Sequence, residues 1–494
     1  MKTAIVIGSG FAGMSAAAFL AKAGWQVTVL EKNSGPGGRG RDMVTNGFSF
    51  DMGPSWYWMP DVFEQFFGKF GKKVSDYYNL VRLDPSYRVY WPDEAHDIPA
   101  GYDELKALFE KIEPGSGAQL DKFMQEAEYK YKVGMHKLVH KPGQSWGEFV
   151  DMDLAKGLFR LDVFTNMKKH VAKHFKNPKL QQLMEFPVLF LGALPQNTPA
   201  LYSLMNFADI KLGTWYPMGG MYKIAEAMHL LAVEQGVNFK FNHNVTAIQV
   251  DGKLAKQVTV TDPAGRQQQF TADVVVGAGD YNHIETKLLP QHLRQYSDAY
   301  WDKRVMAPSC LLFYIGLNKK LTGITHHALF FDTDFGVHGE EIYTSKQWPQ
   351  NPLFYVCAPS VTDQSVAPQG HENMFFLIPV ATGLTGDTEE LRDKYLDMIL
   401  TRYEQKTGQQ VKNAIVYKKS YSVSNFVQDY NSFKGNAYGL ANTLLQTAIL
   451  KPSCRSNKIK NLFYTGQLTV PGPGVPPSLI SGEVVVKEIL KNNV

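Results

Sequence analysis

Three glycines near the start of the chain have the spacing of a loop that binds the pyrophosphate of a dinucleotide. Gly8 permits a tight turn, Gly10 lets the backbone approach the anion, and Gly13 allows the following helix to pack closely. The N-terminus of that helix supplies free amides and a positive potential. The other loop residues, which we also expect at the cofactor, are Ser9, Phe11 and Ala12. This segment therefore predicts dinucleotide binding.

A carboxylate and a glycine pair follow this loop. Glu31 lies 18 residues beyond Gly13 at the end of an apolar run, where it can accept a ribose hydroxyl, and Lys32 comes next. These features alone do not distinguish FAD from NAD. Gly38, the second of two adjacent glycines, and Arg39 follow this carboxylate. Taken alone, Arg39 can belong to a solvated basic loop.

The elements that must position the glycine loop form a βαβ unit. An apolar run at 3–7 predicts a buried parallel strand, small residues at 12–23 predict a helix, and 25–30 predicts a second strand. Further helices are expected at 121–139, 151–175, 222–234, 388–407 and 478–491. Further strands are expected at 238–241, 245–250, 273–277, 310–317, 374–380 and 462–465.

The overall composition excludes several classes of protein. With 44% hydrophobic and 20% charged residues the chain is globular, and a net charge of +4 is too small to indicate nucleic-acid binding. Three distant cysteines predict neither disulfides nor zinc, and a reducing cytoplasm is the expected compartment. We expect no metal, because the adjacent His326 and His327 lack metal-site spacing. The uncharged run 4–21 imitates a secretory signal, but its glycines argue against cleavage.

Longer motifs resemble those of a known flavoprotein family. Residues 37–39 resemble the paired-glycine extension of the family that contains amine oxidases, protoporphyrinogen oxidase and phytoene desaturases. The resemblance implies that the chain passes close to the cofactor at Gly38 and that Arg39 reaches its phosphates or the flavin. Six segments resemble signatures of bacterial phytoene desaturases, namely 50–55, 59–64, 213–220, 359–363, 367–370 and 462–476. The likeness covers essentially the whole chain and is strongest to phytoene desaturases of flavobacterial type. The runs 55–58 and 467–470 depart from the family's usual residues, which leaves the exact carotene open.

The resemblance implies a cofactor, a substrate and a reaction. The cofactor is noncovalently bound FAD, and the substrate is phytoene or a related polyene. Further cofactor contacts are implied at Gly53, Pro54, Ser55, Trp56, Val245, Gly466, Gln467, Gly474 and Val475. The implied reaction is stepwise desaturation of phytoene toward lycopene. Alternatives are desaturation of a later or hydroxylated carotene (3,4-desaturation), carotene isomerisation, and a flavin-free prenyl-lipid carrier, against which the intact glycine loop argues.

The length of 494 residues predicts more than one structural unit. We expect an α/β fold: a Rossmann-type FAD-binding domain built from discontinuous segments, an inserted mixed α+β substrate domain, and a helical membrane-facing subdomain. The FAD-binding domain is expected at 1–75, 216–288 and 455–494. The substrate-binding domain is expected at 76–215 and 289–454, with the helical subdomain near 120–205.

Desaturation needs a group that accepts a proton or stabilises a developing positive charge. Asp209 precedes the aromatic segment 215–217, at a position that is acidic in the similar desaturases, and Glu148 is a second candidate. Each carboxylate can instead be a surface charge or a partner in helix pairing.

A lipid membrane surface is the expected partner, because each buried CH₂ of a forty-carbon substrate is worth about 0.8 kcal/mol. We therefore expect a cytoplasmic protein that associates peripherally with membranes. Five apolar residues at helical spacing predict either a helix lying on an anionic membrane or a core-facing helix. They are Leu161, Phe164, Met167, Val171 and Phe175, and the basic residues around them are Arg160, Lys168, Lys169, Lys173 and Lys176. The proline-containing run 186–208 is expected to line a tunnel or to form core, not to cross a bilayer.

Overall fold

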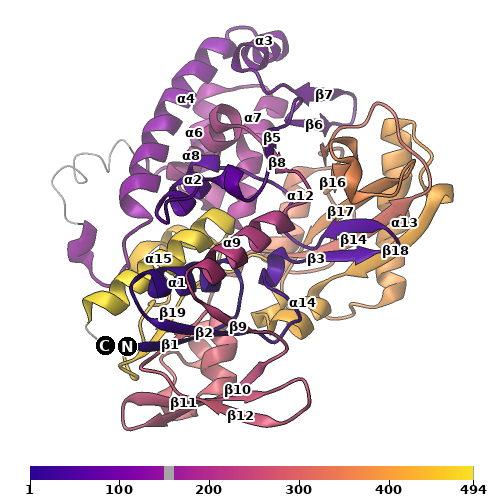
Figure 1. Ribbon diagram of the computed structural model, residues 1–494. Helices are drawn as coiled ribbons and strands as arrows, with labels where there is room; N and C mark the ends of the chain where they lie inside the picture. The colour runs from indigo at the N-terminus through magenta and orange to yellow at the C-terminus, as the bar shows by residue number, and fades with distance from the viewer. Residues whose placement is uncertain (150–160, 493–494) are drawn as a thin grey trace.

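A five-stranded parallel sheet carries the glycine loop in the computed structural model, which describes residues 1–149 and 161–492 (Figure 1). The strand order is β19-β13-β1-β2-β9. The strands are β1 (Thr3–Ile7), β2 (Gln26–Leu30), β9 (Asn238–Lys240), β13 (Val274–Gly277) and β19 (Leu462–Tyr464). They come from three stretches of the chain that are far apart in sequence, and this confirms a Rossmann-type sheet built from discontinuous segments.

Both faces of this sheet are covered, which explains why its strands read as continuous apolar runs. Ala4 and Val6 belong to the core that includes α1, whereas Ile5 and Ile7 belong to a second core on the opposite face. The first face packs against helices α1 (Phe11–Lys22), α9 (Tyr222–Glu234) and α15 (Val475–Lys491). The second face is covered by the antiparallel strands β10 (Asn244–Asp251), β11 (Leu254–Thr261) and β12 (Gln267–Phe270).

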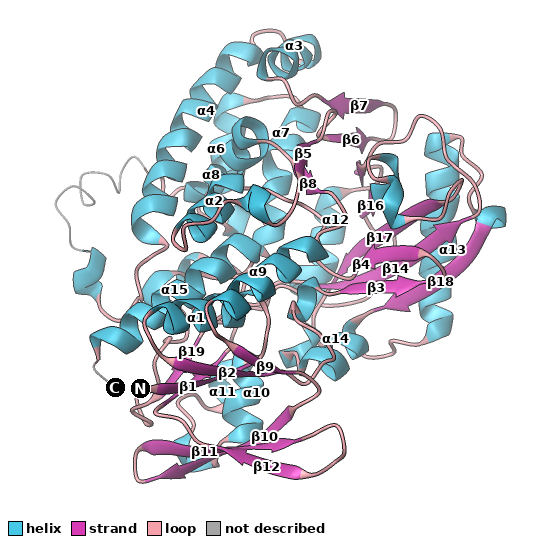
Figure 2. Cartoon of the chain, viewed as in Figure 1, coloured by secondary structure: helices cyan, strands magenta, loops and turns pink. Residues whose placement is uncertain are grey.

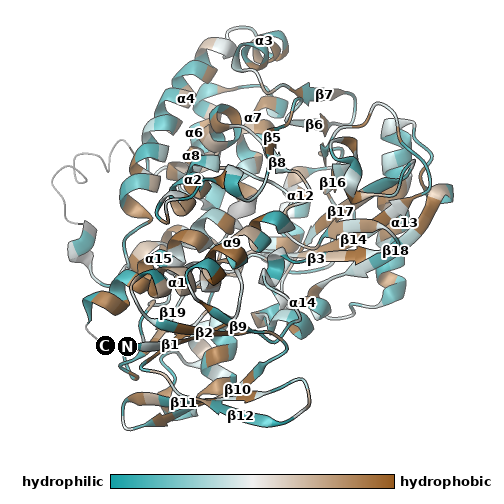
Figure 3. Cartoon of the chain, viewed as in Figure 1, coloured by the Kyte–Doolittle hydropathy of each residue, from teal (hydrophilic) through white to brown (hydrophobic). Residues whose placement is uncertain are grey.

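A seven-stranded mixed sheet forms the second large layer, in the order β18-β14-β17-β16-β15-β6-β7 (Figure 2). Its strands are β6 (Tyr87–Tyr90), β7 (Ala95–Ile98), β14 (Ser309–Leu317), β15 (His327–Phe330), β16 (Phe354–Cys357), β17 (Glu372–Val380) and β18 (Ile415–Tyr421). Every residue of β14 is buried, and Figure 3 shows hydrophobic colour along this strand. Leu311 and Phe313 pack in the core that contains helix α13 (Glu389–Thr407), whereas Cys310 and Leu312 face the other side. That second side holds the larger cavity described below.

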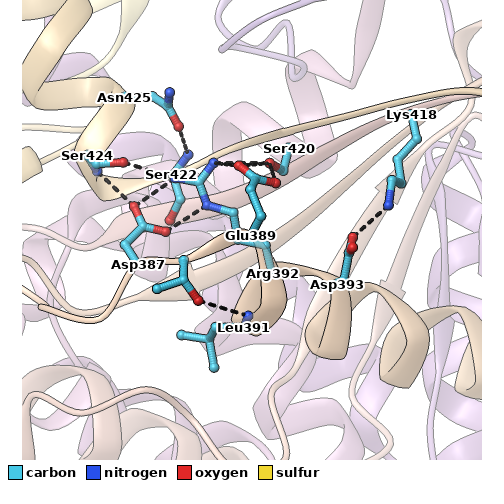
Figure 4. A network of polar contacts seen from close by, with 11 residues as sticks. Asp387, Glu389, Leu391, Arg392, Asp393, Lys418, Ser420, Ser422, Ser424 and Asn425 are labelled. Carbon is cyan, nitrogen blue, oxygen red and sulfur yellow. Dashed lines mark hydrogen bonds and ion pairs between the residues drawn. The ribbon is translucent and has the colours of Figure 1, made fainter.

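A buried arginine joins α13 to the edge of this sheet (Figure 4). Arg392 is only 4% exposed, and its guanidinium makes two parallel hydrogen bonds of 2.7 and 2.8 Å to the carboxylate of Asp387. It also donates to Ser420 on β18 and to Ser424 on α14 (Val423–Tyr430). Because removing one partner would leave a buried charge, the network fixes α13 against the sheet.

A helical region adjoins both sheets. It contains α2 (Pro60–Gly68), α3 (Tyr102–Ile112), α4 (Ser116–Val133), α6 (Met167–His174), α7 (Pro178–Glu185) and α8 (Leu204–Phe207). Smaller elements are β3 (Asp42–Thr45), β4 (Phe48–Asp51), β5 (Leu80–Arg82), β8 (Trp215–Pro217), α10 (Tyr281–His283), α11 (Asp298–Asp302) and α12 (Phe335–Glu340). The other sequence-based helices and strands are confirmed apart from small shifts at their ends, with one exception. The helix expected at 151–175 has its residues 151–160 outside the described part, and 161–166 form turns before α6 begins.

The apolar stripe expected on that helix does not face lipid. Leu161, Met167, Val171 and Phe175 are at most 1% exposed, and the last three pack into the main core, whereas Phe164 is exposed. The core-facing alternative is therefore correct for these four side chains, and the membrane-facing one is wrong for them. Arg160 lies outside the described residues.

The uncharged run 186–208 forms short helical turns instead of one long helix. It contains turns at 186–191, 195–197 and 200–203 and the four-residue helix α8. In the described residues, no helix combines the length and the apolar character that crossing a membrane requires.

Candidate active site

A cavity of about 160 Å³ lies beyond the C-terminal ends of β1 and β2, where open parallel sheets bind ligands. Eleven of the predicted cofactor contacts line it, although they come from five separate stretches of the chain. They are Gly8, Gly10, Phe11, Ala12, Glu31, Lys32, Gly38, Arg39, Val245, Gly466 and Gln467. Sequence reasoning missed further lining residues, among them Asn33, His243, Asp280 and Tyr430. Of these, Asp280 had a visible signal, since it follows the predicted strand 273–277.

The backbone around this cavity has room for a pyrophosphate. Helix α1 starts after Gly10, and no side chain caps it, so the amides of its first turn remain available to an anion. A Cβ added to Gly10 would meet nothing within 4 Å, whereas one added to Gly13 would lie 2.1 Å from the carbonyl oxygen of Gly8. Gly13 therefore serves the close packing of helix on loop, and Gly10 leaves the cavity open.

Glu31 is held where a ribose hydroxyl is expected. The backbone amide and the hydroxyl of Ser9 donate to Oε2 at 2.8 and 2.9 Å, and the amide of Asn33 donates to Oε1 at 2.8 Å. Glu31 is 5% exposed and lines the cavity. Ser9 was predicted as a direct contact, but it is not among the lining residues, and its contacts instead position the carboxylate of Glu31.

A second, larger cavity of about 350 Å³ adjoins the first. The two cavities share Phe11, Arg39, Gln467 and Ser478, so they meet at these residues. The predicted contacts Gly53, Pro54, Ser55, Trp56, Gly474 and Val475 line the second cavity. Most of its wall is aromatic or aliphatic, including Trp58, Phe186, Leu189, Leu329, Phe331 and Leu377. Such a wall suits a long apolar ligand.

Arg39 stands at the junction of the two cavities. Its guanidinium donates to Oε1 of Gln467 at 3.0 Å and to Oγ of Ser432 at 2.9 Å, while its buried Nε has no partner among the described residues. Burial lowers the pKa of Arg39, and the nearby carboxylate of Asp280 opposes this change. A half-buried cation with a free donor fits a cofactor that carries phosphates and carbonyl oxygens. Arg39 is therefore not a solvated basic loop.

Helix α15 directs its N-terminus at the same junction. Gly474 precedes the helix without a side-chain cap, and Pro476 and Pro477 occupy its first turn, where a missing N–H does no harm. Gly474 and both prolines line the second cavity. The positive end of the helix therefore faces the ligand space and favours negative charge there.

Asp209 lies behind the wall of the second cavity, not in it. Its carboxyl is 3% exposed and accepts hydrogen bonds from the hydroxyl of Tyr87 at 2.9 Å and from that of Thr214 at 3.3 Å. The indole of Trp58, which lines the cavity, donates to the same hydroxyl of Thr214 at 2.9 Å. Burial raises the pKa of Asp209 to about 7. Asp209 therefore reaches the ligand space only through other side chains.

Glu148 has a local role. Its carboxylate accepts hydrogen bonds from the backbone amides of Gly143, Gln144 and Ser145 at 2.8 to 3.1 Å. It is not among the residues that line either cavity. Its three amide partners already use both carboxylate oxygens, and this arrangement stabilises a loop and argues against proton transfer.

Comparisons with known proteins agree with this geometry. Residues 11–490 match the family of flavin containing amine oxidoreductases. The chain is 41% identical over 489 residues to a carotenoid 3,4-desaturase of Haloarcula japonica, covering 99% of this chain and 98% of the relative. It is 30% identical to a zeta-carotene-forming phytoene desaturase of Myxococcus xanthus, covering 98% and 93%.

A solved structure supports the same fold. An engineered triple mutant of putrescine oxidase superposes with a TM-score of 0.63 at 12% identity, covering 99% of both chains. At that identity the likeness concerns the fold alone. The two cavities fit FAD and an apolar ligand, and the family matches extend over almost the whole chain. The chain therefore belongs to the flavin containing amine oxidoreductases and, within them, to the FAD-dependent carotenoid desaturases.

Proposed function

We propose that this protein removes two hydrogens from adjacent carbons of an acyclic carotene held in the second cavity. The observation that carries the proposal is the junction of the two cavities at Phe11, Arg39 and Gln467. A hydrocarbon in the apolar cavity is thereby brought to the end of the nucleotide cavity. FAD, when bound, supplies the two-electron oxidation that the protein's own side chains cannot perform.

The chain's residues bind and orient the cofactor and the polyene, and they exclude water. The glycine loop, Glu31 and the first turn of α1 would hold the diphosphate and ribose, and Arg39 with the N-terminus of α15 would favour negative charge at the flavin end. The aromatic and aliphatic wall binds the polyene by burial and fixes which carbons stand at the junction.

Two carotenes are reasonable substrates. The motifs alone favour phytoene, whereas the 41% identity to a carotenoid 3,4-desaturase, against 30% for a phytoene desaturase, supports 3,4-desaturation of a later carotene. The experiment is to incubate the flavin-loaded protein with liposomes that contain phytoene or lycopene and to identify the products by chromatography and absorption spectra. New double bonds formed from lycopene but not from phytoene would select 3,4-desaturation. Absence of product from both carotenes, with a fully loaded flavin, would refute the proposal.

The remaining alternatives are separated by simple measurements. A prenyl-lipid carrier would purify colourless, whereas we expect a yellow protein with a flavin spectrum. An isomerase would change the geometry of a carotene without reducing the flavin. Anaerobic bleaching of the flavin absorbance by substrate would exclude both.

We also propose that the protein associates peripherally with a membrane surface. The exposed basic residues of α6, Lys168, Lys169 and Lys173, follow the exposed side chain of Phe164. A second exposed apolar residue, Leu445, lies in the loop whose Thr447 contacts Tyr202. Basic and apolar side chains of this kind suit the surface of an anionic bilayer, from which the carotene must come.

The catalytic role predicted for Asp209 is proposed in an indirect form. The carboxyl of Asp209 accepts hydrogen bonds from Tyr87 and from Thr214, and Thr214 accepts one from Trp58. Asp209 therefore holds the aromatic wall in place. It is then a positioning residue for the substrate, and no direct proton transfer is assigned to it.

A further inference from the structure

A buried histidine lies directly behind the wall of the second cavity. His327 begins strand β15 and has no exposed surface. Its ring lies flat against the indole of Trp56, with centroids 4.2 Å apart and an interplanar angle of 11°. Its Nδ1 is 2.7 Å from the hydroxyl of Tyr355, and both Trp56 and Tyr355 line the cavity. Tyr355 thus connects His327 to the ligand space.

Tyr355 lines the second cavity beside a segment that reaches the junction of the two cavities. Ser55, which lines the same cavity, and Cys357 are among the side chains close enough to influence the pKa of its hydroxyl. Ser55 belongs to the segment of Gly53, which packs so closely on the carbonyl oxygen of Arg39 that a Cβ there would lie 2.1 Å away. Since Arg39 lines both cavities, the segment of Gly53 and Ser55 extends from the junction along the same wall as Tyr355.

We propose that Tyr355 and His327 are the pair of residues that accepts the proton during desaturation. This inference rests on the proposed function. Bound FAD would be the two-electron oxidant and would take up the hydride when one C–H bond of the carotene breaks with its electron pair. The C–H bond on the adjacent carbon then breaks, its electrons form the new C=C bond, and its proton passes to the oxygen of Tyr355. The hydroxyl proton of Tyr355 moves at the same time to Nδ1 of His327. The carotene loses two electrons, the flavin gains two, and one proton remains on His327.

A neutral acceptor suits this cavity better than a carboxylate. A carboxylate that faces apolar walls carries a large desolvation cost, whereas a neutral phenol and imidazole do not. Burial holds the pKa of His327 well below the usual histidine value, so the resting ring is neutral. A weak base is sufficient, because a proton next to a polyene cation is strongly acidic. The face of Trp56 then stabilises the imidazolium that forms.

A second histidine offers the proton a way out. The ring of His326 lies 4.5 Å from that of His327, and its Nδ1 is 2.8 Å from the hydroxyl of Thr362, which is only half-buried. Among the described residues, Nε2 of both histidines has no hydrogen-bond partner. Buried groups of this kind require an explanation, and release of the Nε2 proton of His327 after its Nδ1 is protonated supplies one for that ring.

The test compares two variants of the pair with a matched tyrosine elsewhere. We expect Tyr355→Phe to keep FAD and carotene binding and to slow the single-turnover formation of the new double bond by roughly 10²-fold or more. We expect a similar loss in His327→Ala, with partial recovery when imidazole is added to fill the vacated space. The control is Tyr395→Phe, which removes another buried hydroxyl and should react like wild type. This hydroxyl donates to the carbonyl oxygen of Pro349 at 2.6 Å, and Tyr395 lines neither cavity.

Isotopic substitution separates a proton acceptor from a merely structural residue. The carotene is deuterated at the carbon that loses the proton, and the isotope effect on double-bond formation is measured. This effect should be larger in Tyr355→Phe than in wild type, because proton removal becomes rate-limiting. Carotene binding, followed by quenching of tryptophan fluorescence, should not change. A wild-type rate of double-bond formation in Tyr355→Phe, or an unchanged isotope effect in a slow variant, would overturn the pair.

Two further outcomes are distinct. If wild type reduces no flavin with phytoene or lycopene, the proposed function fails, and the pair fails with it. If wild type reacts and the variants react equally fast, only the pair fails.

Ligand atoms of His326, His327 and Cys357 lie within 4.8 Å of one another, so bound zinc and copper should be measured as well. One metal ion per chain that is lost in His327→Ala would overturn the pair in favour of a metal site.

Discussion

The two adjoining cavities are built in opposite ways. The nucleotide cavity is formed largely by backbone, by loops and helix starts around one parallel sheet, and short motifs identify most of its wall. The larger cavity is formed by side chains from elements throughout the chain, including Trp56, Phe186, Leu329 and Leu377. A backbone site constrains residue types at fixed spacing, whereas a side-chain wall requires only apolar character and volume. The first can therefore be read in a sequence, and the second is visible only after folding.

The largest expected effect concerns the nucleotide cavity. Gly10→Glu places a charged side chain against the diphosphate, and we expect complete loss of FAD. Absorption spectra of the purified variant measure this directly. Gly68→Glu, at a second glycine where an added Cβ meets nothing within 4 Å, is the control and should purify yellow. A yellow Gly10→Glu protein with full occupancy would show that the phosphate site is misplaced.

The second prediction changes the larger cavity alone. Leu377→Trp fills part of the ligand space, so we expect full FAD occupancy with desaturation slowed by roughly 10²-fold through misplaced carbons. Product formation per flavin measures the effect. Val416→Trp, on an exposed position of the same sheet, should leave it unchanged. Equal turnover in both variants would mean that the carotene binds elsewhere.

The third prediction concerns Asp209, behind the wall. Its folded pKa of about 7 lies above the ordinary value of 3.8, so the folded state binds the proton more tightly than the unfolded state. Its contribution to stability is complete below about pH 4 and is lost as pH rises toward 7, by on the order of 4 kcal/mol at most.

Asp209→Asn should remove this part of the pH dependence. The melting temperature of the variant should fall less than that of wild type between pH 5 and pH 8. We expect flavin reduction to remain within a few fold of wild type, because the carboxyl does not line the cavity. A loss of roughly 10²-fold with full FAD occupancy would instead make Asp209 an acid–base group.

The last prediction concerns the membrane surface, away from both cavities. Replacing Lys168, Lys169 and Lys173 by Gln should weaken binding to anionic liposomes by about 1 kcal/mol per charge at low salt, without effect on FAD. Co-sedimentation measures the change. The control replaces three other exposed lysines, Lys253, Lys256 and Lys460, by Gln. Equal loss in both triple variants would reflect net charge and would remove α6 from the proposed surface.

The sequence by itself determined the nucleotide site and the fold around it. The spacing of Gly8, Gly10 and Gly13, the carboxylate at Glu31 and the apolar strand 3–7 were sufficient, because backbone geometry at a strand-to-helix turn tolerates few residue types. The resemblance of longer motifs added the flavin and the family, which the comparisons confirm.

Only the tertiary structure decided which side chains face the ligand. Asp209 was a reasonable acid from its place in the sequence, yet Tyr87 and Trp58 stand between it and the cavity. The stripe of α6 had the pattern of a membrane helix and also of a core helix, and burial of Val171 selects the second. His327 and Tyr355 lie on different strands and meet only because β15 pairs with β16. Hydrophobic periodicity shows that a face is buried, but what buries it depends on contacts between residues that are distant in sequence.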